Sequence, residues 1–190
     1  MAGAHRMWIK GWVPYEETYR IPLVLRWPAR FAGGRTTDGL VSSHDLAHTY
    51  VDVGSAQALP YADGRSLLPL CTDPGRRDWR DQLLCAYYGG EFLYTQRIAI
   101  TRRFKYVFNG FDFDEFYDLE KDPEEMQNAV DDPLYRADVD DMRARLYEMM
   151  TQFGDPYGDP SPNMSPVQRD GNPPNRYCSP RYLPRGKRRA

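Results

Sequence analysis

The sequence predicts an α+β chain, in which the end of an α/β domain precedes a small antiparallel sheet packed on a C-terminal helix. Residues 21–27 form a short continuous apolar run between turn-like flanks, which is typical of a strand covered on both faces in an α/β sheet. Short aromatic and β-branched segments between 82 and 118, separated by turn residues, indicate an antiparallel meander. Apolar residues in alternating steps of four and three across 133–152 indicate an amphipathic helix.

The N-terminal part of the chain contains the strand predicted from the apolar run. Residues 1–20 are aromatic and polar without a clean period, so we expect a partly buried irregular loop there. The run at 21–27 ends at Pro28, and its Gly-rich continuation over 30–37 predicts a turn. A strand covered on both faces needs neighbours, and residues 29–100 offer few parallel candidates. We therefore expect that part of the α/β sheet lies outside this chain.

Residues 41–54 carry the signals of a helix. Ser42 can cap its amino end, and Asp45 lies three residues further on, in a capping-box position. Gly54 is expected to end the helix in a left-handed conformation. The helix should bury one apolar face, made of Leu46, Tyr50 and Val53.

The second half of the chain should form the sheet and its helix. Asp122 followed by Pro123 predicts a short helix with acidic residues in its first turn. The meander is expected to have strands at 82–88, 97–101, 105–109 and 113–118. The long helix should lay on the sheet an apolar stripe made of Tyr135, Val139, Met142, Leu146, Met149 and Phe153.

We predict three regions along the chain. Residues 1–70 would end the α/β domain, residues 71–153 would form the sheet-and-helix subdomain, and residues 154–190 would be an extended or disordered tail. The tail holds eight of the sixteen prolines, and its last fifteen residues contain six basic side chains and no acid. Few aromatic residues are interleaved with these basic residues, so a solvated end is favoured over a binding segment for an anionic partner.

The overall composition argues against several classes of function. The 25 basic and 27 acidic side chains give a net charge of -2, so there is no general case for a nucleic-acid or membrane partner. Cys71, Cys85 and Cys178 share no CxxC spacing, which argues against a disulfide framework and against a zinc site. The first residues lack the basic and apolar segments of a signal peptide. Localisation and oligomeric state are left open.

Several segments, in their order and spacing, resemble the sulfatase family. GAHRMWIKGWVPYEE at 3–17 resembles the family's G-x-H-x-x-x-x-K…Y-E stretch, and RIPLVLRWP at 20–28 is similar to the strand that follows it. VSSHDLAHTYVDVG at 41–54 resembles the family's V-S-x-x-D-L-x-P-T helix, with His48 where the family usually has proline. DGRSLLP at 63–69 is similar to the family's D-G-x-S-L-x-P turn.

The end of the chain continues this resemblance. KYV at 105–107, EFYDL at 115–119 and DPEEMQN at 122–128 are similar to the family's closing K-Y, E-L-Y-D-L and D-P-x-E-x-x-N elements. The resemblance thus spans residues 3 to about 150. It implies the end of an alkaline-phosphatase-like α/β domain, the activity of a sulfuric ester hydrolase, and a sulfate ester substrate in full-length relatives.

The resemblance also implies two cofactors in full-length relatives: a formylglycine made from the cysteine of a C-x-P-x-R motif, and a calcium ion held by aspartates with Asn or His. Such a cation polarises the sulfate oxygens. In the family the last metal ligands shortly precede the motif lysine, which is Lys10 here. We therefore expect the calcium ligands and the nucleophile upstream of Met1, and this chain alone to bind no cofactor and to be inactive. Cys178 is no substitute, because Arg181 stands one place too early for the motif.

The resemblance places two candidate catalytic residues in the first loop. Lys10 is predicted to contact the sulfate oxygens as a compact cation, against the general alternative of a solvated surface lysine. His5 is a candidate pocket residue, with a hydrogen-bonded structural histidine as an equally weighted alternative.

Other polar residues are assigned structural roles. His44 and His48 have the spacing of metal ligands on a helix, but no third ligand is evident. Glu16 and Glu17 are expected to make structural hydrogen bonds rather than an acid–base pair.

Two acidic clusters are interpreted in the same way. Asp112, Asp114 and Glu115 lack the glycine and distal glutamate of a calcium loop and are expected at a polar hairpin edge. The acids at 122–125 are expected to cap a helix.

Two alternative functions stay open at this point. The chain could come from a related phosphonate monoester hydrolase or phosphodiesterase, which shares the lysine loop and strand and differs in its upstream metal ligands. It could also be a non-catalytic α+β binding module that uses its meander and basic tail.

Overall fold

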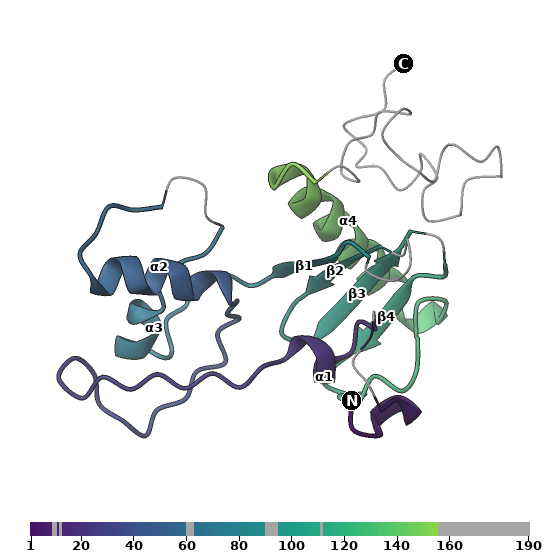
Figure 1. Cartoon of the computed structure of the whole chain (residues 1–190). Coiled ribbons are helices and arrows are strands. Elements are labelled where there is room, and N and C mark those ends of the chain that lie inside the picture. The colour runs from purple at the N-terminus through teal and green to yellow at the C-terminus, as the bar shows by residue number, and fades with distance from the viewer. Residues whose placement is uncertain (9–10, 12, 60–62, 90–94, 111, 156–190) are drawn as a thin grey trace, which may run out of the picture. The chain divides into compact units, whose positions relative to one another are not determined.

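The structure, a computed structural model, describes residues 1–155 apart from short gaps at 9–10, 12, 60–62, 90–94 and 111. The chain separates into two compact units. The sheet unit comprises Met1–Ile21 together with Leu84 and the residues that follow, and the helical unit comprises Pro22–Leu83. Figure 1 shows the strands in the first unit and two of the helices in the second.

The sheet unit contains a four-stranded sheet in the order β1-β2-β3-β4. The β2–β3 and β3–β4 pairs are antiparallel, with Ile98 opposite Val107 and Lys105 opposite Tyr117. The strands are β1 (Leu83–Tyr87), β2 (Gln96–Ile100), β3 (Phe104–Asn109) and β4 (Glu115–Asp118). The predicted meander is confirmed, because every strand lies within two residues of its expected range.

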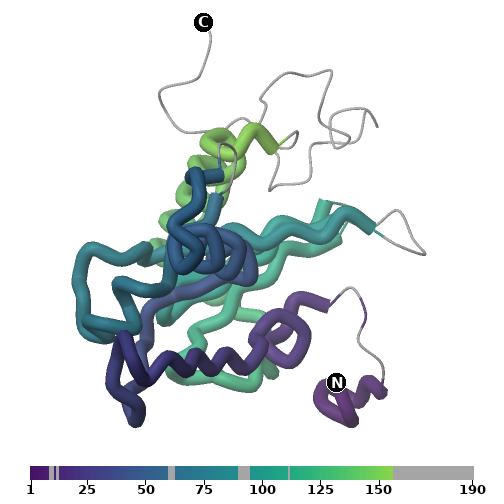
Figure 2. The backbone as a smooth tube through the Cα atoms, turned by 60° about the vertical axis from the view of Figure 1, so that its left-hand side comes forward, coloured from purple at the N-terminus to yellow at the C-terminus, as the bar shows by residue number. Residues whose placement is uncertain are grey.

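Helix α4 (Arg136–Gln152) covers one face of this sheet (Figures 1 and 2). A short 3-10 turn, η2 (Pro133–Tyr135), leads into it, and the Asp132 carboxylate accepts a hydrogen bond from the Leu134 amide at 2.9 Å. The predicted apolar stripe is confirmed apart from Phe153, which is 43% exposed. The buried core comprises Ala99, Tyr106, Phe108, Phe116, Val139, Met142, Leu146, Met149 and Met150.

The N-terminal segment covers the opposite face of the sheet. Side chains alternate along β3, so Lys105 faces away from Tyr106 and the α4 core. The Lys105 ammonium donates a hydrogen bond to the Pro14 carbonyl at 3.1 Å, and the Tyr15 ring meets the edge of Tyr117. The segment contains the turn η1 (Ala4–Arg6) and the short helix α1 (Glu16–Tyr19). The sheet therefore lies between α4 and residues that are about ninety positions earlier in the sequence than β3.

The helical unit contains α2 (His44–Val53) and α3 (Leu68–Thr72). Ser42 and Asp45 interact as the predicted pair, but the residue before the helix is Ser43, whose side chain makes no capping hydrogen bond. The Asp45 carboxylate accepts from the Ser42 amide at 2.7 Å, and the Ser42 hydroxyl accepts from the His44 amide at 3.3 Å. The predicted left-handed stop at Gly54 is wrong, because Gly54 has φ −78 and Ser55 takes the left-handed conformation at φ 50.

The face that α2 buries also differs from the prediction. Tyr50 and Val53 are 71% and 45% exposed, whereas Asp45 and Thr49 are buried. The cause is the turn that follows the helix, whose backbone amides need acceptors. The polar face of α2 supplies those acceptors, so the apolar face is left exposed within this unit.

The predicted strand at 21–27 is extended but pairs with no strand in the described chain. Leu23, Val24 and Leu25 are 40%, 89% and 37% exposed. The prediction of a covered strand is therefore wrong for this structure, because none of the described residues provides a neighbouring ladder.

The predicted short helix at Asp122 is also wrong. This segment is a turn in which the Asp122 carboxylate accepts from the amides of Met126 and Gln127 at 3.0 and 2.8 Å. Glu125 has φ 52, a left-handed conformation that interrupts an α-helix. None of the helices described is both long and apolar enough to cross a bilayer.

Candidate functional site

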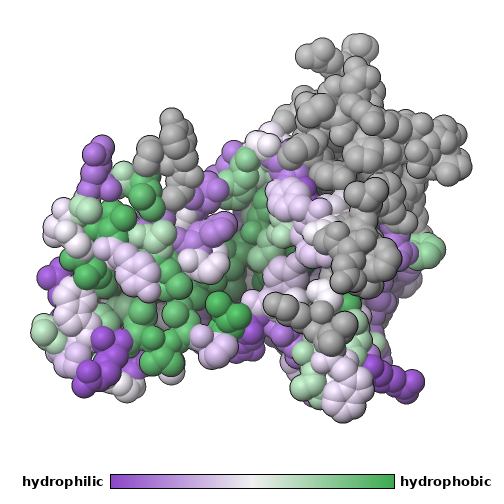
Figure 3. Space-filling model, viewed as in Figure 1, coloured by the Kyte–Doolittle hydropathy of each residue, from purple (hydrophilic) through white to green (hydrophobic). Residues whose placement is uncertain are grey.

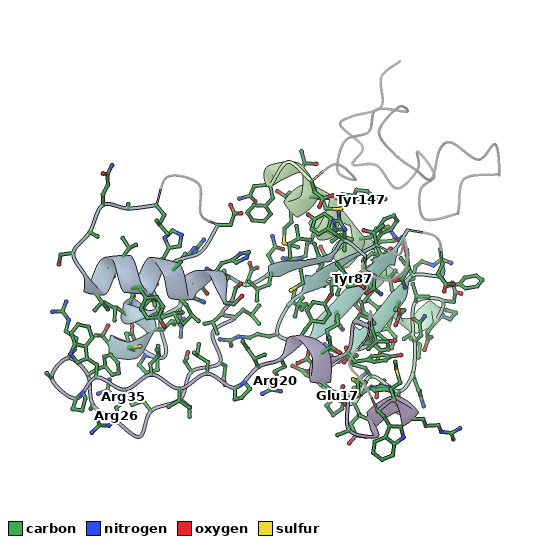
Figure 4. All side chains as sticks on the ribbon, viewed as in Figure 1. Glu17, Arg20, Arg26, Arg35, Tyr87 and Tyr147 are labelled. Carbon is green, nitrogen blue, oxygen red and sulfur yellow. The ribbon has the colours of Figure 1, made fainter. Side chains whose placement is uncertain are left out.

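The two predicted site residues lie on the N-terminal loop, residues 1–20. Lys10 falls outside the described residues, so its role stays a prediction. His5 stacks on Tyr15, with ring centroids 3.7 Å apart and planes within 4°, and its Nε2 lies 3.7 Å from a carboxylate oxygen of Glu17 (labelled in Figure 4). These contacts give His5 a structural part in folding the loop, while its place in a sulfate pocket stays a prediction.

A buried cation anchors the loop to the sheet. The Lys105 Nζ lies 2.6 Å from an oxygen of Glu16 and 2.6 Å from an oxygen of Glu125, and the Lys105 side chain is 0% exposed. We call these three residues the Lys105 cluster. A fully buried ammonium needs such charge-assisted partners because it has lost its hydration. The expectation that Glu16 has a structural role is confirmed.

Glu125 holds the loop and the strand together. One of its oxygens meets Lys105, and the other accepts a hydrogen bond from the Glu16 amide at 2.6 Å. Burial raises the pKa of Glu125, and the neighbouring ammonium of Lys105 acts in the opposite direction. Glu125 therefore does not cap a helix, although the sequence predicted that it would. Its left-handed backbone instead turns a buried carboxylate towards residues more than a hundred positions earlier in the chain.

Two tyrosines extend the anchor. The Tyr117 hydroxyl donates a short hydrogen bond to Glu115, and the Tyr15 ring lies edge-on to Tyr117 with centroids 6.3 Å apart. The other oxygen of Glu115 accepts from the Asn109 side-chain amide at 2.8 Å. Burial raises the pKa of both tyrosines, and the charge of Glu115 adds to the effect. Both phenols therefore stay protonated around neutral pH and act as hydrogen-bond donors or packing surfaces.

The segments that carry the sulfatase resemblance meet at this anchor. The stretch at 14–17, the strand residues at 105–107 and 115–119, and the turn at 122–128 all contribute contacts. Asn128 completes the turn by accepting from the Phe116 amide and donating to the Asp114 carbonyl, both at 3.0 Å. The motif residues near the C-terminus thus support the loop on which Lys10 is predicted to act.

The sequence interpretation missed Lys105 and Glu125 as members of the site. The sequence did contain a signal for Lys105. This lysine stands inside an aromatic and β-branched strand, where an unpaired ammonium would be strongly disfavoured. No comparable signal marked Glu125, which lies among other acids in a segment that resembles a helix start.

A second buried cluster fixes the hairpin between β3 and β4. Tyr106 donates a short hydrogen bond to Asp114, and the Tyr106 oxygen accepts from Arg143 Nε of α4 at 2.9 Å. Asp114 also accepts from the Asn109 amide at 3.1 Å. Burial raises the pKa of Asp114 to about 7. The expected polar hairpin edge is therefore wrong at Asp114, which is 0% exposed and belongs to the packing between sheet and helix.

In the helical unit, Asp45 organises the D-G-x-S turn. Its two oxygens receive a bidentate pair from Arg80 at 2.8 and 2.6 Å, and one of them also accepts from the Arg65 amide at 2.8 Å. Thr49 accepts from the Leu67 amide at 2.9 Å. A Cβ atom at Gly64 would lie 2.5 Å from the His44 carbonyl oxygen, so this close approach requires glycine.

The described residues do not fit the calcium or formylglycine expected in full-length relatives. They contain no group of three or more His, Cys, Asp or Glu side chains placed to hold a metal ion. Cys71 and Cys85 are free thiols, and burial raises the pKa of Cys85 to about 11, which disfavours a thiolate at neutral pH. Cys178 lies outside the described residues. We assign no step of the reaction to a metal ion or to a cysteine of this part of the chain.

Comparison with solved structures defines the class of the fold. The structure of BT4656 in complex with its substrate D-glucosamine-2-N,6-O-disulfate matches with a TM-score of 0.76 and 27% identity, over 82% of this chain and 33% of that chain. The phosphonate monoester hydrolase of Agrobacterium radiobacter matches with a TM-score of 0.53 and 23% identity, over 60% of this chain and 25% of that chain, and shares the fold. The class is that of alkaline phosphatase superfamily hydrolases.

Sequence comparison narrows the class to a family. Residues 3–152 match the family described as N-sulphoglucosamine sulphohydrolase, C-terminal. The N-acetylglucosamine-6-O-sulfatase of Bacteroides thetaiotaomicron is 30% identical over 148 residues, which are 74% of this chain and 26% of that protein. This chain belongs to the sulfatase family, and the resemblance drawn from its motifs is confirmed. It spans about a quarter to a third of the length of these relatives.

Proposed function

We propose that this chain serves as the C-terminal part of a sulfuric ester hydrolase and that its N-terminal loop presents Lys10 to the sulfate group. The formylglycine nucleophile and the calcium ligands belong to the part of the fold that this chain does not span, so the chain alone is inactive. A compact ammonium beside the sulfate neutralises charge that develops on its oxygens as the ester bond breaks.

The Lys105 cluster is the observation that carries this proposal. It fixes the loop on the C-terminal side of Lys10, through Glu16, and the stack of His5 on Tyr15 holds the other side to the same anchor. A loop whose flanking residues are already held to the sheet loses less entropy when it binds a ligand, which favours the use of this loop for substrate binding. The buried charges of the sheet unit thus hold residues on either side of Lys10, and this supports the proposal.

The relatives favour a sulfate ester over a phosphonate ester as the substrate. Among the solved structures, BT4656 matches with a TM-score of 0.76 and 27% identity, whereas the phosphonate hydrolase matches with a TM-score of 0.53 and 23% identity and shares the fold alone. BT4656 is described with a doubly sulfated glucosamine as its substrate. These names support a sulfate ester as the substrate class of the complete enzyme.

A chimera tests the proposal. Residues 3–152 replace the matching segment of the B. thetaiotaomicron sulfatase, and hydrolysis of N-acetylglucosamine 6-sulfate is measured with calcium present. We expect turnover by the chimera and none by the chain of 190 residues alone. Lys10→Ala should lower kcat/KM of the chimera by about 100-fold or more, whereas Lys121→Ala, a largely exposed lysine, should leave it unchanged.

Each result has a defined meaning. A folded chimera whose turnover is insensitive to Lys10→Ala would remove Lys10 from the site. Faster hydrolysis of phenylphosphonate than of the sulfate ester would favour the phosphonate hydrolase alternative. Robust sulfate turnover by the chain alone would contradict its inactivity.

A further inference from the structure

The Lys105 cluster carries a net negative charge when all three of its groups are ionised. The carboxylates of Glu16 and Glu125 both lie 2.6 Å from Lys105 Nζ. Among the described residues, only Lys105 places a cation within ion-pair distance of either carboxylate. In Figure 3 the most hydrophilic side chains lie at the surface of both units, as is usual for charged groups, whereas the side chains of Lys105 and Glu125 are fully buried.

The other titratable groups that face the cluster add no positive charge to it. Burial raises the pKa of the Tyr15 and Tyr117 phenols and of the Cys85 thiol, so these three groups stay neutral around pH 7. Glu17 and Glu115 bring further negative charge to the surroundings of Tyr15. The excess negative charge of the cluster is therefore not compensated from the neighbouring elements.

A buried cluster with excess negative charge favours the uptake of a proton. Two carboxylates that share one cation repel each other, and burial disfavours the charged form of each. The Glu125 side chain is 0% exposed and that of Glu16 is 25% exposed, so the proton belongs mainly on Glu125. Burial raises the pKa of Glu125 even though the Lys105 ammonium acts against it. With this proton in place, Lys105 and Glu16 remain as a neutral pair.

We propose that the Lys105 cluster is a proton-dependent anchor, which holds the N-terminal loop more tightly as the pH falls. The proton comes from the solvent, forms an O–H bond on the Glu125 carboxylate when the loop docks, and returns to the solvent when the loop is released. The inference rests on the proposed function only in the role given to the loop as the carrier of Lys10. The anchor itself follows from the contacts of the three charged groups.

The contacts of the cluster connect this proton to the loop. One Glu125 oxygen accepts from the Glu16 amide at 2.6 Å, and Lys105 donates to the Pro14 carbonyl at 3.1 Å. When the loop is released, water replaces Glu16 and Pro14 beside Glu125 and Lys105, and the penalty for ionising Glu125 falls. The docked state therefore has the higher pKa at Glu125. Its contribution to docking is complete below about pH 4, the ordinary range of a carboxyl group, and is lost as the pH rises through the raised pKa.

Hydrogen exchange on the whole chain tests the proposal between about pH 4 and 8. The probes are the amide of Glu16, which donates to Glu125, and the amide of Arg20, which donates to the Glu16 carbonyl at 2.7 Å. After correction for the intrinsic effect of pH, their protection should fall as the pH rises, by up to about tenfold per pH unit. The carbon-13 shift of the Glu125 carboxyl should titrate above the ordinary range of glutamate in the same samples.

Two variants remove one carboxylate each. Glu125→Gln should make the protection of both amides independent of pH to within about twofold, because the titrating group is gone. Glu16→Gln should weaken the dependence on pH, because Glu125 then has the cation to itself. The matched control is Glu124→Gln, an exposed glutamate next to Glu125, which should keep the full dependence. Asp114→Asn should also keep it, because release of the loop alone leaves Asp114 in its place between sheet and helix.

Three outcomes would overturn the proposal. These are a dependence on pH that persists in Glu125→Gln, a Glu125 carboxyl that titrates at about pH 4, and a loss of the dependence at the loop amides in Asp114→Asn. The last outcome would mean that the loop is released only when the whole sheet unit unfolds. Because exchange is measured on this chain alone, a chimera without sulfatase activity would count against the proposed function and not against the proton-dependent anchor.

Discussion

At the scale of single residues, one lysine in the middle of β3 decides how the N-terminal loop is held. The strand itself was predictable, because its aromatic and β-branched residues have a local signature. The partners of Lys105 were not, since Glu16 lies 89 positions before it and Glu125 lies 20 positions after it. Such pairing depends on the tertiary fold, and a single sequence shows only that a buried ammonium needs carboxylates somewhere.

Replacing Lys105 by methionine should release the loop. The change keeps most of the length of the side chain but leaves Glu16 and Glu125 without their cation, and breaking a buried ion pair costs about 3–5 kcal/mol. The unfolding free energy from urea denaturation should fall accordingly, and the Glu16 amide should exchange faster with deuterium. In Lys105→Met/Glu125→Gln the two losses should not add, because the second change removes one of the stranded charges.

The control for Lys105 is another lysine of the sheet unit. Lys121 is 66% exposed at its side chain and lies 3.8 Å from Asp118, so Lys121→Met should change the stability by less than about 1 kcal/mol. Equal effects of the two methionine variants would show that the Lys105 cluster does not anchor the loop.

At the scale of elements, α2 shows where sequence periodicity is reliable and where it fails. Its location and the contact between Ser42 and Asp45 were predicted correctly, because both depend on residues within one turn of each other. Its buried face was not, because the unit packs Asp45 and Thr49 against the turn at 63–67. The spacing of apolar residues identified a face of α2 that could be buried. The backbone amides of the turn at 63–67 need acceptors, however, and these amides determine that the polar face is the buried one here.

Gly64→Ala should separate this turn from α2. A Cβ atom would stand 2.5 Å from the His44 carbonyl oxygen and 2.7 Å from a ring carbon of His48, so the backbone must shift. Overpacking of this kind costs about 1–3 kcal/mol. The Arg65 and Leu67 amides, which donate to α2, should exchange faster with deuterium.

Gly33 supplies the matched control in the same unit. A Cβ atom there would have no neighbour within 4 Å, and its φ lies outside the left-handed range. Gly33→Ala should therefore leave exchange at Arg65 and Leu67 unchanged. A Gly64→Ala variant that behaves like Gly33→Ala would contradict the close packing of the turn on α2.

At the scale of the whole molecule, the predictable parts are those held by short-range signals. The meander and α4 followed from turn residues and apolar spacing, and they were confirmed nearly residue for residue. The predictions that failed concern segments whose partners are distant in the sequence. These are the segment at 21–27, which was predicted as a covered strand but is exposed and unpaired, and the turn at 122–128, whose left-handed Glu125 reaches back to the N-terminal loop. Local preference cannot show which remote segment will provide the partner.

The buried acids of the sheet unit also set how stability depends on pH. Asp114 has its pKa raised by burial from an ordinary value of 3.8 to about 7, and the pKa of Glu125 is raised by burial as well. Asp118 acts the other way, because its hydrogen bonds from Arg103 lower its pKa. Its contribution to stability is lost only as the pH falls below about 4, the ordinary range of a carboxyl group. Between about pH 4 and 7, the two carboxyl groups whose pKa is raised, Asp114 and Glu125, therefore determine how stability changes with pH.

The stability of the sheet unit should therefore fall as the pH rises from about 4 to about 7. In this window the folded chain keeps a proton on Asp114, while the unfolded chain has lost it, so raising the pH favours unfolding by up to about 1.4 kcal/mol per pH unit. Native-state hydrogen exchange at Val107 and Phe108 of β3, corrected for the intrinsic effect of pH, measures this slope.

Asp114→Asn removes the titrating group and should flatten the slope of stability against pH, leaving the smaller part due to Glu125. Asp112→Asn, at an exposed position two residues away, should keep the full slope. A slope that is unchanged in Asp114→Asn, or a stability that rises through this window in the unmodified chain, would contradict a protonated Asp114 beneath Tyr106 and Arg143.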